Sequence, residues 1–218
     1  MDRFTVRRAE MVEHDIAARG VRDARVLAAM RAVPREDFVP TSRRDEACAD
    51  HPLPIGAGQT ISQPYIVALM SEALQLHGPE RVLEIGTGSG YAAAVLGRLA
   101  AEVHTVECIP ELAERARRQL AALGVANVQV HVGDGTLGWP AAAPYDAIVV
   151  TAAGPQVPPA LKAQLAPGGR LVMPVGLQHG WQDLVRVTRG AADEFSTETL
   201  CTVAFVPLVG AQGWHGEG

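Results

Sequence analysis

Three glycines at alternate positions, with a carboxylate about twenty residues further on, form the spacing that points most clearly to chemistry. Residues 82–90 read as a buried strand that turns through Gly86, Gly88 and Gly90 into a helix. Glycines at such a turn let the backbone approach a nucleotide-like ligand, because no side chains stand in the way. The spacing departs from the G-x-G-x-x-G of dinucleotide sites, since the third glycine comes one residue early and Tyr91 follows. A tight strand-to-helix turn without a ligand is the alternative.

Two acidic residues accompany this loop. Glu84 stands two residues before the first glycine, and Glu107 ends the next predicted strand, at residues 103–107. A carboxylate at that distance accepts hydrogen bonds from both hydroxyls of a ribose; a solvated glutamate at a strand end is the alternative. The loop resembles the one that holds S-adenosylmethionine in class I methyltransferases more than a nicotinamide site, and we therefore predict a methyl-donor site.

The elements that must position these residues alternate along the chain. Apolar periodicity, capping residues and the placement of Gly and Pro indicate which segments are helical and which are extended. The predicted helices are residues 4–19, 24–32 (capped by Asp23), 64–76, 91–100, 110–123 and 158–166; the predicted strands are 81–85, 103–107, 127–132, 146–151, 170–174, 182–188 and 197–206. Residues 40–61, rich in Pro and Gly, are expected to be a long loop. We predict an α/β, doubly wound, mostly parallel sheet with an antiparallel C-terminal hairpin and extra N-terminal helices.

Ligands in such sheets bind at the carboxyl ends of the strands. Gly133-Asp134-Gly135 follows the third predicted strand, and Thr151 follows the fourth. Asp134 between two glycines could accept a hydrogen bond from an adenine amino group. It could equally be a turn residue that binds its own backbone, and the local sequence does not separate these two interpretations.

Composition narrows the class of protein. A chain of 218 residues with 48% hydrophobic residues fits one α/β domain, and a net charge of −5 gives no footprint for non-specific nucleic-acid binding. Cys48, Cys108 and Cys201 lie far apart without C-x-x-C spacing, so neither a zinc site nor a disulfide framework is indicated, and we expect no metal. A reducing cytoplasm is favoured. Residues 1–10 are charged, and no apolar run approaches the ~20 residues that span a bilayer, so we expect neither a secretory signal nor membrane insertion.

Several segments together resemble one family over nearly the whole chain. They are residues 23–39 (DARVLAAMRAVPREDFV), 53–65 (LPIGAGQTISQPY), 81–91 (RVLEIGTGSGY), 133–135, 143–152 (APYDAIVVTA), 164–176 and 205–208. The glycine loop is shared by many methyltransferases, whereas GQTISQP at residues 58–64 is the specific signal. On these segments the chain resembles the protein-L-isoaspartate O-methyltransferases of the bacterial type.

The resemblance implies a class I methyltransferase (Rossmann-like) fold with N-terminal helices that cover the cofactor. It implies S-adenosylmethionine as methyl donor, S-adenosylhomocysteine as product, and the isoaspartyl α-carboxylate of damaged proteins and peptides as acceptor, with repair through a succinimide. We accordingly expect a single, monomeric domain: residues 1–62 as a covering extension, 63–210 as the cofactor-binding core, and 211–218 as a flexible tail.

The resemblance also implies roles for individual residues. The family's active-site serine matches Ser62, and its cofactor loop matches Gln59, Thr60, Ile61 and Ser62. Its glycine-loop contact matches Gly86, with Glu84 and Gly88 beside it; its ribose acid matches Glu107, and its adenine-side pair matches Asp134 and Gly135. For Ser62 the alternative is a helix N-cap ahead of Gln63-Pro64, and both roles can hold together.

One position departs from the family. Cys48 stands where the family usually carries an aromatic residue, which leaves open how residues 47–50 pack over the substrate. Two other functions stay possible: a carboxyl methyltransferase of peptide natural products, which would often carry more sequence after residue 208, and a non-catalytic module that keeps the cofactor fold. The intact Ser62, Glu107 and glycine loop favour the repair enzyme.

Overall fold

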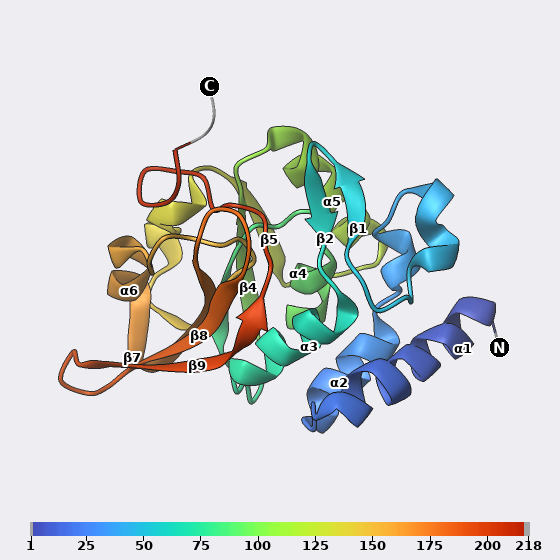
Figure 1. The fold of residues 1–218 in the computed structure, drawn as a ribbon, viewed down its shortest axis with the longest axis horizontal. Helices are drawn as coiled ribbons and strands as arrows, with labels where there is room; N and C mark the ends of the chain where they lie inside the picture. Colours follow the sequence, from blue (N-terminus) through green and yellow to red (C-terminus); the bar gives the residue numbers. More distant parts are fainter. Residues whose placement is uncertain (1, 216–218) are drawn as a thin grey trace.

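Strands and helices alternate from residue 81 onward and build one seven-stranded sheet (Figure 1). The computed structural model describes residues 2–215. The strand order is β5-β4-β3-β6-β7-β8-β9, with parallel pairing from β5 to β7 and antiparallel pairing of β8 with both neighbours. The strands are β3 (Arg81–Ile85), β4 (Glu102–Glu107), β5 (Val128–Val132), β6 (Tyr145–Val150), β7 (Leu165–Gly176), β8 (Gln182–Arg189) and β9 (Phe195–Val203). The predicted class I methyltransferase fold with its antiparallel C-terminal hairpin is confirmed.

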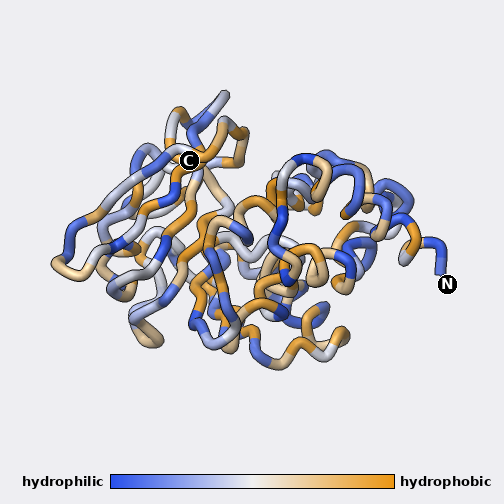
Figure 2. Tube along the Cα trace, turned by 90° about the horizontal axis from the view of Figure 1, so that it is seen from below, coloured by the Kyte–Doolittle hydropathy of each residue, from blue (hydrophilic) through white to orange (hydrophobic). Residues whose placement is uncertain are grey.

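The central strands are buried on both faces, and this divides the apolar core in two. Successive side chains of a strand point to opposite faces. On β3, Val82 joins the core beneath the N-terminal helices, α3 (Pro64–Ala73), α4 (Tyr91–Leu96) and α5 (Pro110–Ala122), while Leu83 and Ile85 join the core beneath α6 (Pro159–Gln164). Orange, hydrophobic stretches accordingly run through the middle of the molecule in Figure 2. Burial on both faces is typical of parallel strands covered by helices.

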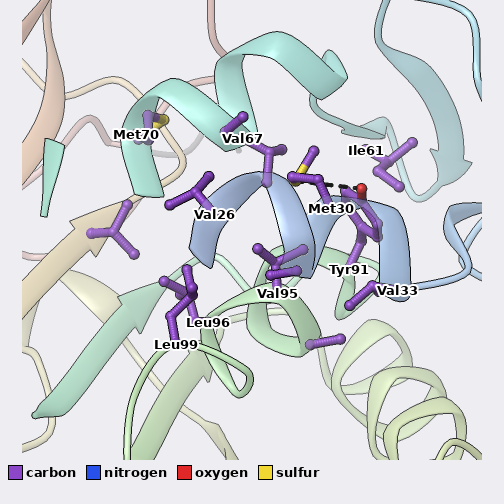
Figure 3. Packing of buried hydrophobic residues seen from close by; sticks show 14 of the residues in the cluster. Val26, Met30, Val33, Ile61, Val67, Met70, Tyr91, Val95, Leu96 and Leu99 are labelled. Carbon is purple, nitrogen blue, oxygen red and sulfur yellow. Dashed lines mark hydrogen bonds between the residues drawn. The ribbon is translucent and has the colours of Figure 1, made fainter. Parts of the chain in front are cut away.

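The N-terminal extension packs on this core through apolar side chains. It begins with α1 (Arg3–Glu10), continues helically through Met11–Ile16 and Ala17–Arg19 to Gly20 (φ +107°), and then forms α2 (Ala24–Ala32). Figure 3 shows α2 between α3 and α4, with Val26 and Met30 pointing into the shared core. The Tyr91 hydroxyl donates to Met30 Sδ at 3.7 Å. The extension is therefore fixed to the helix that follows the glycine loop.

The long loop predicted for residues 40–61 contains a small hairpin that the sequence did not indicate. β1 (Leu53–Gly56) pairs antiparallel with β2 (Gln59–Ile61). Leu53, Ile55 and Ile61 are buried, and residues 56–58 all have positive φ, as a tight turn requires. The Pro and Gly residues of this segment predicted a loop. The alternation of apolar side chains in β1, from Leu53 to Ile55, is only three positions long and too short to indicate a strand. Residues 41–46 form a 3₁₀ turn in the same segment.

Part of the segment expected as a flexible tail makes hydrogen bonds with the rest of the chain. Ala211 N–H donates to Asp134 Oδ2 at 2.8 Å, Gln212 N–H donates to Thr136 Oγ1 at 3.0 Å, and Trp214 Nε1–H donates to the Ala153 carbonyl at 3.1 Å. Small, polar residues predicted fraying, whereas the amides of residues 211–212 find side-chain acceptors after β5. Residues 216–218 of that expected tail lie outside the described residues. Within residues 2–215, none of the helices combines the length and the apolar character needed to cross a bilayer.

The cap of α2 provides a test of how the extension is held. The Asp23 carboxylate accepts hydrogen bonds from Arg25 N–H at 2.7 Å and Val26 N–H at 3.3 Å. We expect Asp23→Ala to lower the free energy of unfolding by about 1 kcal/mol, because two amides at the helix start lose their acceptor. Asp23→Asn should keep most of the stability in the same urea titration, since an amide oxygen also caps. Equal losses in both variants would contradict a capping role.

Candidate active site

A cavity of about 320 Å³ lies beyond the carboxyl ends of β3, β4 and β6. Its walls come from segments that are distant in sequence: β2 with Ser62, α3, the glycine loop with α4, the turn after β4, the segments after β5 and β6, and residues 206–209. The residues predicted from sequence that line it are Gln59, Thr60, Ile61, Ser62, Gly86, Gly88, Glu107 and Gly135. The edge of the sheet thus gathers most of the predicted site, as parallel topology requires.

The glycine loop has a backbone shape that only glycine adopts easily. Gly86, Gly88 and Gly90 have φ of +94°, +53° and +88°. A Cβ atom at Gly86 would also collide with Oγ1 of Thr151. The Thr151 hydroxyl is itself held in place, because two carbonyl oxygens can accept its proton: that of Gly86 at 2.8 Å and that of Ile85 at 3.0 Å. The end of β6 therefore locks the loop against the cavity.

Glu107 joins the glycine loop to the end of β4. Its Oε2 accepts a hydrogen bond from Gly88 N–H at 2.8 Å, and its Oε1 accepts one from Ile109 N–H at 3.0 Å. The residue is 5% exposed and lines the cavity. Oε2 keeps a further lone pair, and Oε1 is shared only with the weak thiol donor of Cys108, whose Sγ lies 3.7 Å away, so both oxygens have acceptor capacity for a diol. This geometry fits the ribose-binding interpretation better than a solvated strand end.

Glu84 lies beneath the cavity and does not line it. It is fully buried, and its Oε2 accepts a hydrogen bond from Thr105 Oγ1 at 2.5 Å. Thr105 Oγ1 lies 2.6 Å from Thr87 Oγ1 in the glycine loop. Burial raises the pKa of Glu84 to about 8, with the nearby Glu107 adding to the shift. The side chain is thus a neutral acid near pH 7 that supports the loop from below. It has no surface in the cavity, and its predicted part in cofactor binding stays a prediction.

Asp134 and Gly135 separate into two roles. Gly135 lines the cavity, and a Cβ there would collide with Ile85. The Asp134 carboxylate is already engaged: Oδ1 accepts from Thr136 N–H at 2.9 Å and Thr136 Oγ1–H at 2.6 Å, and Oδ2 accepts from Ala211 N–H. Burial alone would raise the pKa of Asp134, but these hydrogen bonds hold it below its usual value. These contacts support the turn interpretation of Asp134, and its predicted role beside the adenine stays a prediction.

Ser62 stands between two cavities. It follows β2, and α3 is preceded by Gln63 as N-cap with Pro64 as its first residue, so Ser62 does not cap the helix. It lines the first cavity and also a second, larger one of about 780 Å³. The two cavities share residues from three segments: Thr60, Ser62, Thr151, Val206 and Pro207. A ligand in one cavity and a ligand in the other would meet at Ser62.

Sequence reasoning did not assign a cavity role to Cys108, Ile109 or residues 206–209, all of which line the first cavity. A usable signal existed for the first two, because they directly follow a parallel strand. Residues 206–209 follow an antiparallel hairpin, and only the bridge between Ala153 and Pro207 brings them to the site. Among residues 2–215, no three His, Cys, Asp or Glu side chains are grouped to hold a metal ion.

The buried Glu84 makes stability depend on pH. Burial raises the pKa of Glu84 from an ordinary value of 4.5 to about 8 in the folded chain. The contribution of Glu84 to the free energy of unfolding is therefore fully present below pH ~4.5 and is lost as the pH rises through 8. We expect Glu84→Gln, a neutral isostere, to flatten this decline, by at most ~1.4 kcal/mol per pH unit. Urea unfolding at pH steps from 5 to 8.5 measures it, with the exposed Glu114→Gln as control. Parallel profiles for Glu84→Gln and the parent would contradict a neutral buried acid.

Comparison with known proteins agrees with this geometry. The family model described as protein-L-isoaspartate(D-aspartate) O-methyltransferase matches residues 6–213. A protein-L-isoaspartate O-methyltransferase 1 of Rhodopseudomonas palustris (strain HaA2) is 63% identical, over 97% of this chain and 86% of the relative. A protein-L-isoaspartate O-methyltransferase of Methanoculleus marisnigri is 57% identical over 96% of this chain and 94% of its own length.

Solved structures show the same likeness. One protein-L-isoaspartate O-methyltransferase superposes with a TM-score of 0.83 at 31% identity, covering 94% of this chain and 67% of its own. A second, from Plasmodium falciparum in complex with S-adenosyl-L-homocysteine, has a TM-score of 0.77 at 23% identity, covers 93% of this chain and 98% of its own, and supports the fold. A match across nearly the whole chain, in sequence and in fold, leads to one conclusion: the chain belongs to the protein-L-isoaspartate(D-aspartate) O-methyltransferase family.

Proposed function

We propose that this chain transfers a methyl group from S-adenosylmethionine to the α-carboxylate of L-isoaspartyl residues in damaged proteins and peptides. The ester so formed starts repair through a succinimide. Membership of the family supports the reaction and the methyl donor. The observation that carries the assignment of the site is the position of Ser62 on the boundary of the two cavities.

The first cavity fits the methyl donor. Glu107 would accept hydrogen bonds from the ribose hydroxyls, because its two oxygens are already oriented by backbone amides. Gly86 and Gly88 would let the loop backbone approach the ligand, and Gly135 would leave room beside the adenine. Gln59, Thr60 and Ile61 would cover the donor from β2. When bound, S-adenosylmethionine supplies an electrophilic methyl group on a sulfonium.

The second cavity would hold the polypeptide acceptor. An α-carboxyl group has a reference pKa of roughly 3.3–3.7 and is ionised at neutral pH, so the chain needs no strong general base. Ser62 would donate a hydrogen bond from its hydroxyl to one carboxylate oxygen and turn the other toward the first cavity. Orientation of this kind contributes up to ~7–11 kcal/mol to lowering a barrier. The only polar side chains at the boundary among the described residues are one serine and two threonines, which fits a reaction governed by positioning.

The location and the oligomeric state stay predictions. Three free cysteines, Cys48, Cys108 and Cys201, are compatible with the reducing cytoplasm that we propose. A monomer would suffice, because one chain contributes every wall of both cavities described here.

The reaction can be tested directly with two short peptides that differ only in an isoaspartyl or a normal aspartyl residue. We expect labelled methyl from S-adenosylmethionine to appear as a base-labile ester on the isoaspartyl peptide alone, because only there is the α-carboxylate a free group within the chain. Label on both peptides, or on neither while the cofactor still binds, would contradict the proposed function.

Removing the Ser62 hydroxyl should separate chemistry from binding. We expect Ser62→Ala to lower kcat on the isoaspartyl peptide more than tenfold, with a modest change in cofactor affinity, because the carboxylate loses its orienting donor. Ser71→Ala is the matched control, since Ser71 also lines the first cavity but donates its hydroxyl to the Val67 carbonyl at 2.8 Å. Turnover near the parent value at saturating peptide would show that Ser62 has no orienting role.

A further inference from the structure

Two large apolar side chains are conspicuously exposed beside the second cavity. Trp181 is 73% exposed and Leu177 is 68% exposed, the highest values among the large hydrophobic residues of the described chain. Both belong to the connection between β7 and β8, residues 177–181, and Trp181 lines the second cavity. Apolar surface held in water beside a cavity marks a contact with a ligand or partner more often than an isolated exposed residue does.

The connection is fastened to the wall of this cavity by one buried amide. Gln182 is 2% exposed; its Nε2 donates to the Leu177 carbonyl at 2.9 Å, and its Oε1 accepts from Phe205 N–H at 2.9 Å. Phe205 lines the same cavity. The loop that carries Trp181 is therefore tied at its base to the segment that runs on to Val206 and Pro207 at the Ser62 boundary.

Another part of the cavity wall carries an arginine whose charge already has a partner. The Arg19 guanidinium lies 3.6 Å from the centre of the Tyr65 ring and pairs with Asp50 Oδ2 at 2.5 Å. Asp50 also accepts from Gln63 Nε2 at 2.6 Å. A charged ligand side chain would have to compete with these existing partners. The wall thus offers an occupied ion pair and an aromatic ring, which favours an apolar occupant.

We propose that Trp181 forms a subsite for an apolar side chain of the substrate polypeptide close to the isoaspartyl residue. This proposal rests on the proposed function, since it places the isoaspartyl carboxylate at Ser62 and the flanking chain in the second cavity. The cavity is continuous from Ser62 to Trp181, so one polypeptide segment reaches both. Tryptophan suits this role because it buries a large area with little loss of side-chain freedom.

The subsite would give the enzyme a means of selection. Apolar side chains are mostly buried in intact proteins and become accessible where a segment has unfolded. An isoaspartyl residue presented together with such a side chain would bind better than one in a polar, exposed turn. Binding energy from residues remote from the reacting carboxylate appears in kcat/KM.

The test uses two isoaspartyl peptides of equal length and charge, one with leucine on both sides of the isoaspartyl residue and one with glycine there. We expect the parent to prefer the leucine peptide and Trp181→Ala to lower kcat/KM for that peptide about tenfold, through KM, with kcat nearly unchanged. The glycine peptide should change less than twofold. Trp181→Phe should retain most of the preference.

A matched control and a second readout keep the result clear. Phe195→Ala removes an exposed aromatic from the other end of the β8–β9 hairpin, where it lines neither cavity, and should leave the preference unchanged. Calorimetric titration of each peptide in the presence of S-adenosylhomocysteine measures the affinity that the subsite contributes, without turnover. Equal losses for both peptides in Trp181→Ala, or none for either, would overturn the proposal. An inactive parent that still binds the leucine peptide more tightly would contradict the proposed reaction alone.

Discussion

The double hydrogen bond that Glu107 accepts from Gly88 and Ile109 is the interaction on which the candidate site depends most. It connects the loop after β3 to the turn after β4, two segments that strand pairing alone leaves free beyond the sheet. A buried carboxylate is costly unless charge-assisted hydrogen bonds satisfy it, and here backbone amides provide them. The same bonds orient the oxygens that face the cavity, so the ligand-binding geometry exists before any ligand arrives.

A second layer of support lies below this carboxylate. Glu84, Thr105 and Thr87 form a buried polar chain under the glycine loop, and Thr151 holds the loop from the neighbouring strand. The buried chain of side chains ends at Thr87 within the loop itself, and Thr151 donates toward the Gly86 carbonyl. Because burial raises the pKa of Glu84 to about 8, this side chain is protonated near neutral pH and adds no negative charge beneath the loop.

The position of Ser62 depends on packing of a different kind. The hairpin of β1 and β2 reaches the sheet edge because Leu53, Ile55 and Ile61 are buried, and Met30 of α2 packs against Tyr91 in the same core (Figure 3). The N-terminal extension is thereby attached to the helix that begins at the glycine loop. The two cavities that we propose for donor and acceptor consequently adjoin the same apolar core, with Ser62 at their boundary. A boundary residue of this type can position a reactant without carrying charge of its own.

Local patterns determined much of this protein. The strands from Arg81 to Val150 and their intervening helices follow from apolar runs, caps and glycines, and the edge where Gly86 and Glu107 meet follows from parallel topology. Only the tertiary structure decided three features: the pairing of β1 with β2, the hydrogen bonds that residues 211–214 make with the rest of the chain, and the placing of Gly135, but not Asp134, on the cavity wall. Each depends on a contact between segments far apart in the chain, such as that of Ala211 with Asp134, which no local periodicity encodes. The same reason applies to Ser62: the sequence motif marks it, but only the folded chain places it between two cavities.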